Sequence, residues 1–478
     1  MSEREVIIKT ALVSRLLLIL LQYIANFIIP DHKADAFCYP KSGESGFIDE
    51  LVIHLLGGFV RWDAQHFMHI SRYGYTYEHS LAFFPFCPIL VRYVVVILSY
   101  FIPFLDLDSL TLVVFVSINI LSFILSAICL YELSIFILNK DIAYKATILF
   151  CYNPASVFFM APYTESIFSY LTFKSMLNSI LLYKKYCDLH CNLQIKDVVY
   201  IIPICLSTLT RSNGVLNIGF LVYVLICLYL KKVKLNENTF DTLLCSIKFI
   251  VLTSFLVFFC MIPFISFQMY AFKMFCTDFE TNLPDFVLKQ AKLENFVLPG
   301  TFSKHNQTWC FKQIPLAYSH VQSHYWKVGF LQYYELKQIP NFALAFPLVF
   351  IIVSNVLEFF KHFPKRFEML FNFNLISQKD FRSNKFNPLM LVFIIHATAL
   401  TVFCVFNIHV QVTTRMLCSA SPVLYWFSVY YVSDLHEGIA FKKIFSGDCC
   451  TKEYFILVYF ISYFVIGTIM FCNFLPWT

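Results

Sequence analysis

The chain has 478 residues, of which 59% are hydrophobic and only 14% are charged, and its mean hydropathy is +0.67. This apolar content excludes an ordinary soluble domain and predicts several transmembrane helices. The net charge of +6 is modest and lies in short loops, so it bears on membrane topology and not on nucleic-acid binding.

The first predicted span covers residues 10–30 and follows a charged start. It has no small-residue cleavage site and its apolar part is long, so we interpret it as an uncleaved signal anchor. Arg4, Lys9 and Arg15 lie near its beginning, which predicts a cytosolic N-terminus.

Residues 58–88 form the most polar stretch beside an apolar segment, GFVRWDAQHFMHISRYGYTYEHSLAFFPFCP. Ionisable groups are costly near a bilayer and are usually kept for a function. The carboxylate of Asp63 suits a general base that takes a proton from a sugar hydroxyl. The alternative is that Asp63 pairs with Arg61 or Arg72 and only fixes the loop.

The same stretch contains His66, His69 and His79 beside Glu78. Such a group of residues could bind a metal ion. The alternative, which we adopt, is that the histidines form hydrogen bonds within the loop or contact a phosphate.

The apolar run at residues 83–104 either crosses the membrane or lies in its interface. Arg92 interrupts it and three prolines break it. If it does not cross, five clusters of lysine and arginine fall in the cytosol, at residues 140–145, 184–196, 231–234, 361–385 and 442–452. The positive-inside rule therefore favours an interfacial helix and 11 spans. The other ten spans are predicted at residues 110–138, 146–160, 166–182, 198–210, 215–230, 244–270, 342–360, 388–406, 417–432 and 455–474.

This topology predicts a lumenal side that carries four polar clusters, at residues 61–78, 163–166, 210–214 and 409–415. The loop at residues 271–339 falls on the same side and contains the sequon of Asn306. The 17 cysteines are scattered, which argues against a disulfide framework. Cys276 and Cys310 share the large loop and could pair there if it is lumenal.

Three of these clusters each have two interpretations. Glu165, after Tyr163, either starts a helix or lines a cavity, since Pro154 and Pro162 shorten the preceding helix. Arg211, beside Asn213, either binds a phosphate or ends a helix in water. Arg415, which follows Gln411, has the same two interpretations.

Five runs together resemble the PIG-V family, the GPI mannosyltransferases II of the GT-C superfamily. They are spread over most of the chain and occur at residues 62–85 (WDAQHFMHISRYGYTYEHSLAFFP), 153–166 (NPASVFFMAPYTES), 210–214 (TRSNG), 326–347 (WKVGFLQYYELKQIPNFALAFP) and 409–426 (HVQVTTRMLCSASPVLYW).

The resemblance implies an all-α polytopic membrane protein with a GT-C-like fold, about 11 transmembrane helices, and interfacial helices in the first lumenal loop at residues 31–109. It implies one membrane-embedded domain in the endoplasmic reticulum, with residues 271–339 as a second lumenal loop. Such enzymes transfer the second mannose of the glycosylphosphatidylinositol (GPI) core, α-1,6-linked, from dolichyl-phosphate-mannose to a lipid-linked precursor. No metal or other cofactor is expected, and the need for an accessory subunit is left open.

Within this family reading, Asp63 matches the acidic base of the first lumenal loop, and displacement at the sugar inverts its configuration. Arg211 or Arg415 would stabilise the departing phosphate, and Trp62 and Tyr75 would form walls of the sugar site. The expected substrate-binding residues are Arg61, Trp62, His66, Tyr75, Glu78, Tyr163, Glu165, Arg211, Asn213, Gln411 and Arg415, with Asn306 as a glycosylation site.

There are three rival functions. A transporter predicts internal symmetry and polar groups at the bilayer midplane, and neither is found in the sequence. A membrane scaffold would tolerate Asp63→Asn. A transferase that uses another dolichyl-phosphate sugar or acceptor is the nearest rival.

Overall fold

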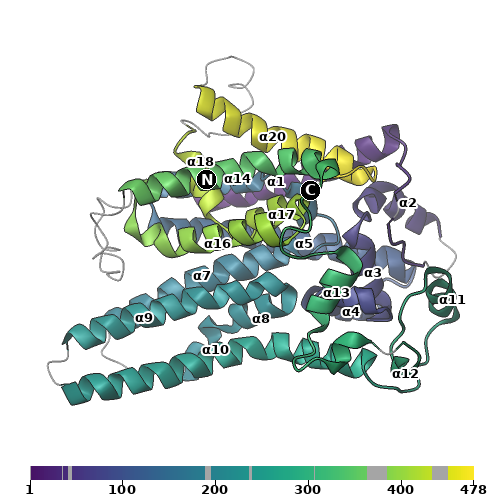
Figure 1. The fold of residues 1–478 in the computed structure, drawn as a ribbon. Coiled ribbons are helices and arrows are strands. Elements are labelled where there is room, and N and C mark those ends of the chain that lie inside the picture. The colour runs from purple at the N-terminus through teal and green to yellow at the C-terminus, as the bar shows by residue number, and fades with distance from the viewer. Residues whose placement is uncertain are drawn as a thin grey trace.

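The computed structural model describes residues 2–34, 36–40, 46–188, 195–235, 239–305, 307–362, 385–432 and 450–477. In these residues the fold is helical, and the only β-type pairing is one isolated bridge between Asp278 and Thr301 (Figure 1). Seven of the described helices are long and apolar enough to cross a membrane. The predicted all-α membrane fold is therefore confirmed, whereas the count of 11 spans remains a prediction.

The long helices run along one axis of the molecule, with α5 at their centre (Figure 1). α5 is mostly buried and packs against α1, α4, α6 and α7, whereas α10 is exposed along most of its length. The long helices are α1 (Glu3–Ile28), α5 (Leu107–Ile137), α7 (Glu165–Asp188), α9 (Ile218–Leu235), α10 (Thr239–Phe275), α14 (Ile339–His362), α16 (Leu391–Asn407) and α20 (Thr451–Cys472).

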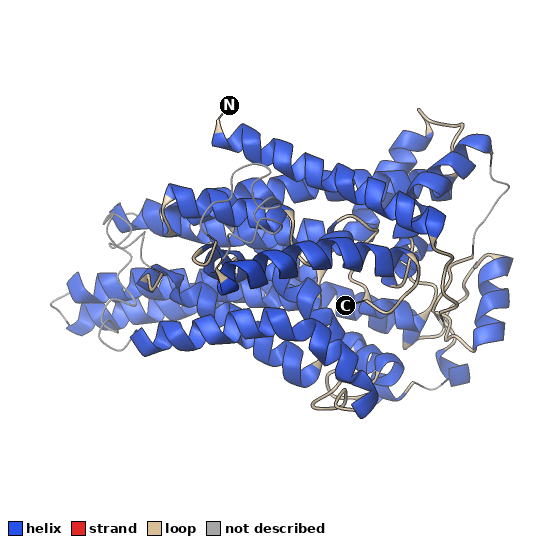
Figure 2. Cartoon of the chain, turned by 90° about the horizontal axis from the view of Figure 1, so that it is seen from above, coloured by secondary structure: helices blue, strands red, loops and turns tan. Residues whose placement is uncertain are grey.

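Shorter helices gather at one end of the bundle, at the right of Figure 1 and again in Figure 2. They come from the two predicted lumenal loops, so these loops lie side by side. α4 has 14 residues, and a helix of that length rises only about 21 Å, less than the hydrocarbon thickness of about 30 Å. The first loop contributes α2 (Phe47–Leu56), α3 (Asp63–Tyr73), the 3₁₀ turn η2 (Glu78–Ala82) and α4 (Phe86–Ser99), and the second α11 (Asp285–Glu294), α12 (Phe302–His305) and α13 (Ala317–Trp326).

Three predicted spans coincide with short or broken helices. The span predicted at residues 146–160 ends early, at Cys151, where Asn153 and Pro154 turn the chain. The span predicted at residues 417–432 is divided at Pro422. These helices are α6 (Lys140–Cys151), α8 (Ile202–Thr210), α17 (Thr413–Ala420) and α18 (Val423–Val429), with the 3₁₀ turns η3 (Ser156–Phe159), η5 (Ser212–Asn217) and η11 (Val410–Val412) beside them.

Arg15 donates hydrogen bonds to backbone oxygens at the place where the chain breaks after α6. It is fully buried in α1, and its guanidinium donates to the backbone oxygens of Cys151 and Ser156, both at 3.1 Å. The same group lies 3.8 Å from the ring centroid of Phe123. Arg15, which the sequence analysis counted among the positive residues near the start of the first span, is thus held by contacts inside the protein.

Candidate functional site

A cavity of about 450 Å³ opens where the two loops meet the ends of the long helices. Its wall combines charged, amide and aromatic side chains, so it can offer both polar contacts and apolar surfaces to a ligand. Eight of the predicted site residues line it, namely Trp62, Asp63, Tyr163, Glu165, Arg211, Asn213, Gln411 and Arg415.

Asp63 is the first residue of α3 and faces this cavity. Its backbone N–H donates to the hydroxyl of Tyr163 at 3.1 Å. The preceding residue, Trp62, has a φ of 54°, a left-handed conformation that a tryptophan rarely adopts. Backbone strain of this kind is concentrated at functional sites, and here it fixes the direction in which α3 begins.

Four charged side chains form a continuous chain across the site. Arg415 Nη2 lies 2.9 Å from Asp63 Oδ2, and Arg415 Nη1 lies 3.9 Å from Glu165 Oε1. Arg211 pairs with the same oxygen of Glu165. Two carboxylates and two guanidinium groups sum to zero formal charge, so each ion has a counter-ion before any substrate binds.

The four charges differ in their access to the cavity. The side chain of Asp63 is 30% exposed, whereas those of Arg415 and Arg211 are 16% and 15% exposed. Glu165 is fully buried, and its Oε2 has no hydrogen-bond partner among the described residues. Asp63 is therefore the carboxylate that a bound substrate can reach most readily.

The break between α6 and α7 positions Tyr163 and Glu165. Asn119 of α5 donates to the backbone oxygens of Ala161 and Tyr163, and the Ser166 hydroxyl donates to Phe159 O at 2.6 Å. These buried hydrogen bonds give partners to backbone oxygens that no longer have a helical one, as a helix break at membrane depth requires. Glu165 then begins α7 facing the cavity.

The turn after α8 positions Arg211 and Asn213. Gly214 packs so closely on the end of α8 that a side chain there would overlap the backbone of Ser207. The Ser212 hydroxyl donates to the Tyr318 hydroxyl at 2.8 Å, which joins the turn to the second loop. Asn213 Nδ2 has no acceptor among the described residues, although it is buried at the cavity.

Four predicted site residues do not line the cavity. Arg61 donates to the backbone oxygen of Cys472 at 3.0 Å and to Asp31 at 2.9 Å, so it fastens the loop. The Tyr75 hydroxyl donates to Phe83 O at 2.6 Å, and Tyr75 itself does not line the cavity. The other two, His66 and Glu78, are buried in packing between the loops.

His66 is stacked between two phenylalanines, with ring centroids 4.3 Å from Phe37 and 4.5 Å from Phe83. Burial holds the pKa of His66 well below its usual value and lowers the pKa of His79 to about 4. Among the described residues, no group of His, Cys, Asp or Glu side chains has the arrangement of a metal site. The contacts of these histidines are those of an aromatic core.

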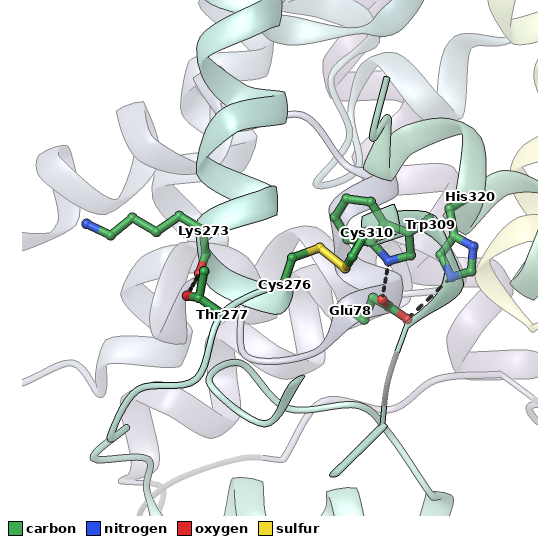
Figure 3. The surroundings of a disulfide bond; sticks show 7 residues. All are labelled: Glu78, Lys273, Cys276, Thr277, Trp309, Cys310 and His320. Carbon is green, nitrogen blue, oxygen red and sulfur yellow. Dashed lines mark hydrogen bonds and ion pairs between the residues drawn. A yellow bond between two sulfur atoms is a disulfide. The ribbon is translucent and has the colours of Figure 1, made fainter. Parts of the chain in front are cut away.

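Glu78 joins the first loop to the second (Figure 3). Its carboxylate accepts hydrogen bonds from Trp309 Nε1 and from the Tyr325 hydroxyl, both at 2.8 Å, and His320 Nε2 lies 3.7 Å away. Burial alone would raise the pKa of Glu78, but these neighbours outweigh it and the pKa lies below its usual value.

A disulfide between Cys276 and Cys310 closes the second loop beside Glu78 (Figure 3). It joins the residue after α10 to the turn that carries Trp309. The pairing that the sequence left open is therefore present, whereas the predicted glycosylation site, Asn306, lies outside the described residues.

Several cavity residues were missed from the sequence. Tyr318, Gln322 and Trp326 line the cavity from one face of α13, and their spacing of four residues was the signal that could have found them. His409 stands just before the predicted Gln411. Trp477 comes from the segment after the last span, where no sequence pattern pointed to a site.

The chain is similar to known proteins along its whole length. The sequence profile of the mannosyltransferase (PIG-V) family matches residues 3–478. The human GPI alpha-1,6-mannosyltransferase 2 is 31% identical over 99% of this chain and 99% of the relative, and the Rattus norvegicus protein of that name is 34% identical over 100% and 99%. An Archaeoglobus fulgidus oligosaccharyltransferase structure matches with a TM-score of 0.45 and 13% identity, over 98% of this chain and 56% of that one. The chain belongs to the mannosyltransferase (PIG-V) family.

Proposed function

We propose that this protein is a GPI α-1,6-mannosyltransferase that adds the second mannose of the GPI core. The donor is dolichyl-phosphate-mannose, the acceptor is a lipid-linked GPI precursor, and the reaction takes place at the lumenal face of the endoplasmic reticulum membrane. The observation that carries the proposal is the partly exposed carboxylate of Asp63, held by Arg415 in a polar and aromatic cavity of a protein of this family.

In the proposed reaction Asp63 accepts the proton of the acceptor's 6-hydroxyl. The hydroxyl oxygen forms a bond to the anomeric carbon of the donor mannose, and the bond from that carbon to the phosphate oxygen breaks. The electron pair leaves with dolichyl phosphate, and a single displacement inverts the anomeric configuration. No metal ion or other cofactor enters this proposal, so activity should survive dialysis against EDTA.

We assign the two arginines different tasks. Arg415 contacts Asp63 at 2.9 Å and so fixes the orientation of the base. Arg211 is paired only with Glu165 among the described ionisable residues, and it lines the cavity. The leaving phosphate gains a negative charge as the donor bond breaks, and Arg211 is the cation available to stabilise it.

The lumenal orientation is supported by the Cys276–Cys310 disulfide, because disulfides persist in oxidising compartments. The sequon of Asn306 lies in the same loop. The positive-inside count from the sequence points the same way.

The proposal is tested in cells that lack the second GPI mannosyltransferase. The wild-type protein should restore GPI-anchored proteins at the cell surface, and Asp63→Asn at equal abundance should not, so that the one-mannose precursor accumulates. Glu294→Gln, an exposed carboxylate of the second loop, is the matched control and should restore them fully.

Other outcomes would overturn separate parts. If Asp63→Asn also restores the surface proteins, Asp63 is structural and Glu165 is the next candidate base. If neither form does so although both reach the endoplasmic reticulum, the assignment of acceptor or donor is wrong.

A further inference from the structure

The segment that follows α20, Asn473–Trp477, turns back into the molecule. The Asn473 backbone oxygen accepts a hydrogen bond from His32 N at 2.9 Å, and Leu475 N donates to Met470 O at 2.9 Å. The mark at this end of the chain lies within the outline of the bundle in both views (Figures 1 and 2). Pro476 and Trp477 consequently line the cavity that contains Asp63.

This segment is joined to the loop that carries Asp63. The guanidinium carbon of Arg61 lies 4.7 Å from the ring centroid of Phe474, and the rings of Trp62 and Phe474 are 5.7 Å apart in an edge-to-face arrangement. Arg61 also donates to Cys472 O at 3.0 Å, at the end of α20. The strained turn before Asp63 therefore rests on the segment after α20.

Within the segment, the ring of Trp477 packs against α20, and its N–H group has no hydrogen-bond acceptor among the described residues. Its ring packs on Gly467 of α20, where a side chain would overlap the indole, and lies 5.1 Å from the ring of Tyr463. Its Nε1 has no acceptor among the described residues. Buried tryptophan N–H groups usually have a partner, and an unmet one costs stability.

Two more donors at the cavity have the same property. Trp62 Nε1 and Asn213 Nδ2 are buried without an acceptor among the described residues, and both residues line the cavity. All three groups are N–H donors, so the ligand that suits them is rich in acceptor oxygens. The head of a lipid-linked sugar, with hydroxyl and phosphate oxygens, has this chemistry.

We propose that Trp477 is a substrate-binding residue, whose indole packs on the sugar-phosphate head of one of the two lipid-linked substrates. Gly467 acts through Trp477, because only a residue without a side chain leaves room for the ring. The inference rests on the proposed mannosyl transfer for the identity of the substrates. It extends that proposal to a segment that the sequence did not assign to the site.

The test uses the purified full-length protein in lipid-containing detergent, with dolichyl-phosphate-mannose and the one-mannose GPI precursor varied in turn. Trp477→Phe, which keeps a ring but loses the N–H group, should raise the KM for one substrate about 3-fold, and Trp477→Ala about 10-fold, with kcat within about twofold of wild type. The substrate whose KM changes identifies the one that Trp477 contacts.

Gly467→Ala provides a second perturbation from inside α20. It should raise the same KM by displacing the indole, and it should have no further effect in a Trp477→Ala background, because the ring is then absent. If Trp477→Ala does not accumulate, Trp477→Phe and Gly467→Ala decide the matter.

Trp426→Phe is the control for loss of a buried indole. Trp426 is fully buried outside the cavity and donates to Ser134 Oγ at 2.7 Å, so its loss should lower thermal stability and leave both KM values unchanged. The proposal for Trp477 is overturned if Trp477→Phe and Gly467→Ala behave in the same way as this control.

Failure of the wider function would look different. If the wild-type protein transfers no mannose from this donor, the proposed reaction is wrong. In that case the role of Trp477 is tested by binding alone. The rise in melting temperature on adding dolichyl phosphate or the one-mannose precursor is compared between wild type and Trp477→Phe. Equal stabilisation of wild type and Trp477→Phe by both lipids would refute its role.

Discussion

Replacing Glu78 distinguishes two roles for this residue. The structure indicates that it holds the two loops together, whereas the sequence predicted that it binds substrate. Its carboxylate accepts two hydrogen bonds of 2.8 Å from the second loop, and it is fully buried. A hydrogen bond to a charged group contributes roughly 1.5–3 kcal/mol, so Glu78→Leu should destabilise the contact between the loops by about 3–6 kcal/mol. Glu78→Gln keeps an acceptor oxygen, and we expect about half of that loss.

The assay is thermal unfolding of the purified protein, together with limited proteolysis of residues 271–339. Glu78→Leu should unfold at a lower temperature and be cut faster in this loop, and Glu78→Gln should be intermediate. Glu294→Leu, an exposed carboxylate in the same loop, should match wild type. A Glu78→Leu protein as stable as wild type, but with a raised KM for a substrate, would refute the reasoning and restore the role predicted from sequence.

Three further predictions concern the loops and the turn after α8. Gly214→Ala should abolish most activity because the added carbon overlaps the end of α8, while Gly219→Ala, which meets nothing within 4 Å, should retain it in the same assay. Cys276→Ser should cost about 3–4 kcal/mol of stability, as expected for a disulfide that closes a separation of 34 residues, and wild type under reducing agent should show the same loss of melting temperature. Burial lowers the pKa of His79 to about 4 and that of His69 to about 3. In the unfolded chain these two imidazoles take up a proton near pH 6.5, whereas in the folded protein they do not. The free energy of unfolding should therefore be highest above pH 6.5. It should fall by about 1.4 kcal/mol per histidine at pH 5.5, which a melting series from pH 7.5 to 5 checks, and an unchanged melting temperature over this range would contradict the assignment.

The long helices could be predicted because each has an apolar run that continues for the thickness of a membrane. The interfacial interpretation of residues 83–104 was raised by Arg92 and three prolines and decided by the positive-inside count, and it remains a prediction. α4 has 14 residues, fewer than a transmembrane helix needs. Residues 146–160 and 417–432 were each predicted as one span, although Pro154 was expected to shorten the first of them. Hydropathy averages over a window, whereas the breaks after Cys151 and before Pro422 are stabilised by single hydrogen bonds from distant residues such as Asn119.

The site was predictable where chemistry and motif coincide. Asp63, Glu165 and Arg415 come from three distant runs, and the structure brings them within ion-pair distance. Arg61 and Glu78 carry equally suggestive charges, but their partners lie elsewhere in the fold, and a sequence does not display partners. Trp477 was missed because it reaches the cavity through a turn of the chain that only the packed bundle creates.

Arg15 imposes an order on the assembly of the protein. Its acceptors on Cys151 and Ser156 lie 136 and 141 residues later in the chain. At synthesis rates of about 5–20 residues per second, these two acceptors are made on the order of ten seconds after Arg15. An uncompensated arginine within a span costs roughly 2.5–3.5 kcal/mol. We therefore expect the newly made α1 to remain beside the insertion machinery until α6 and the turn at Ser156 have been synthesised.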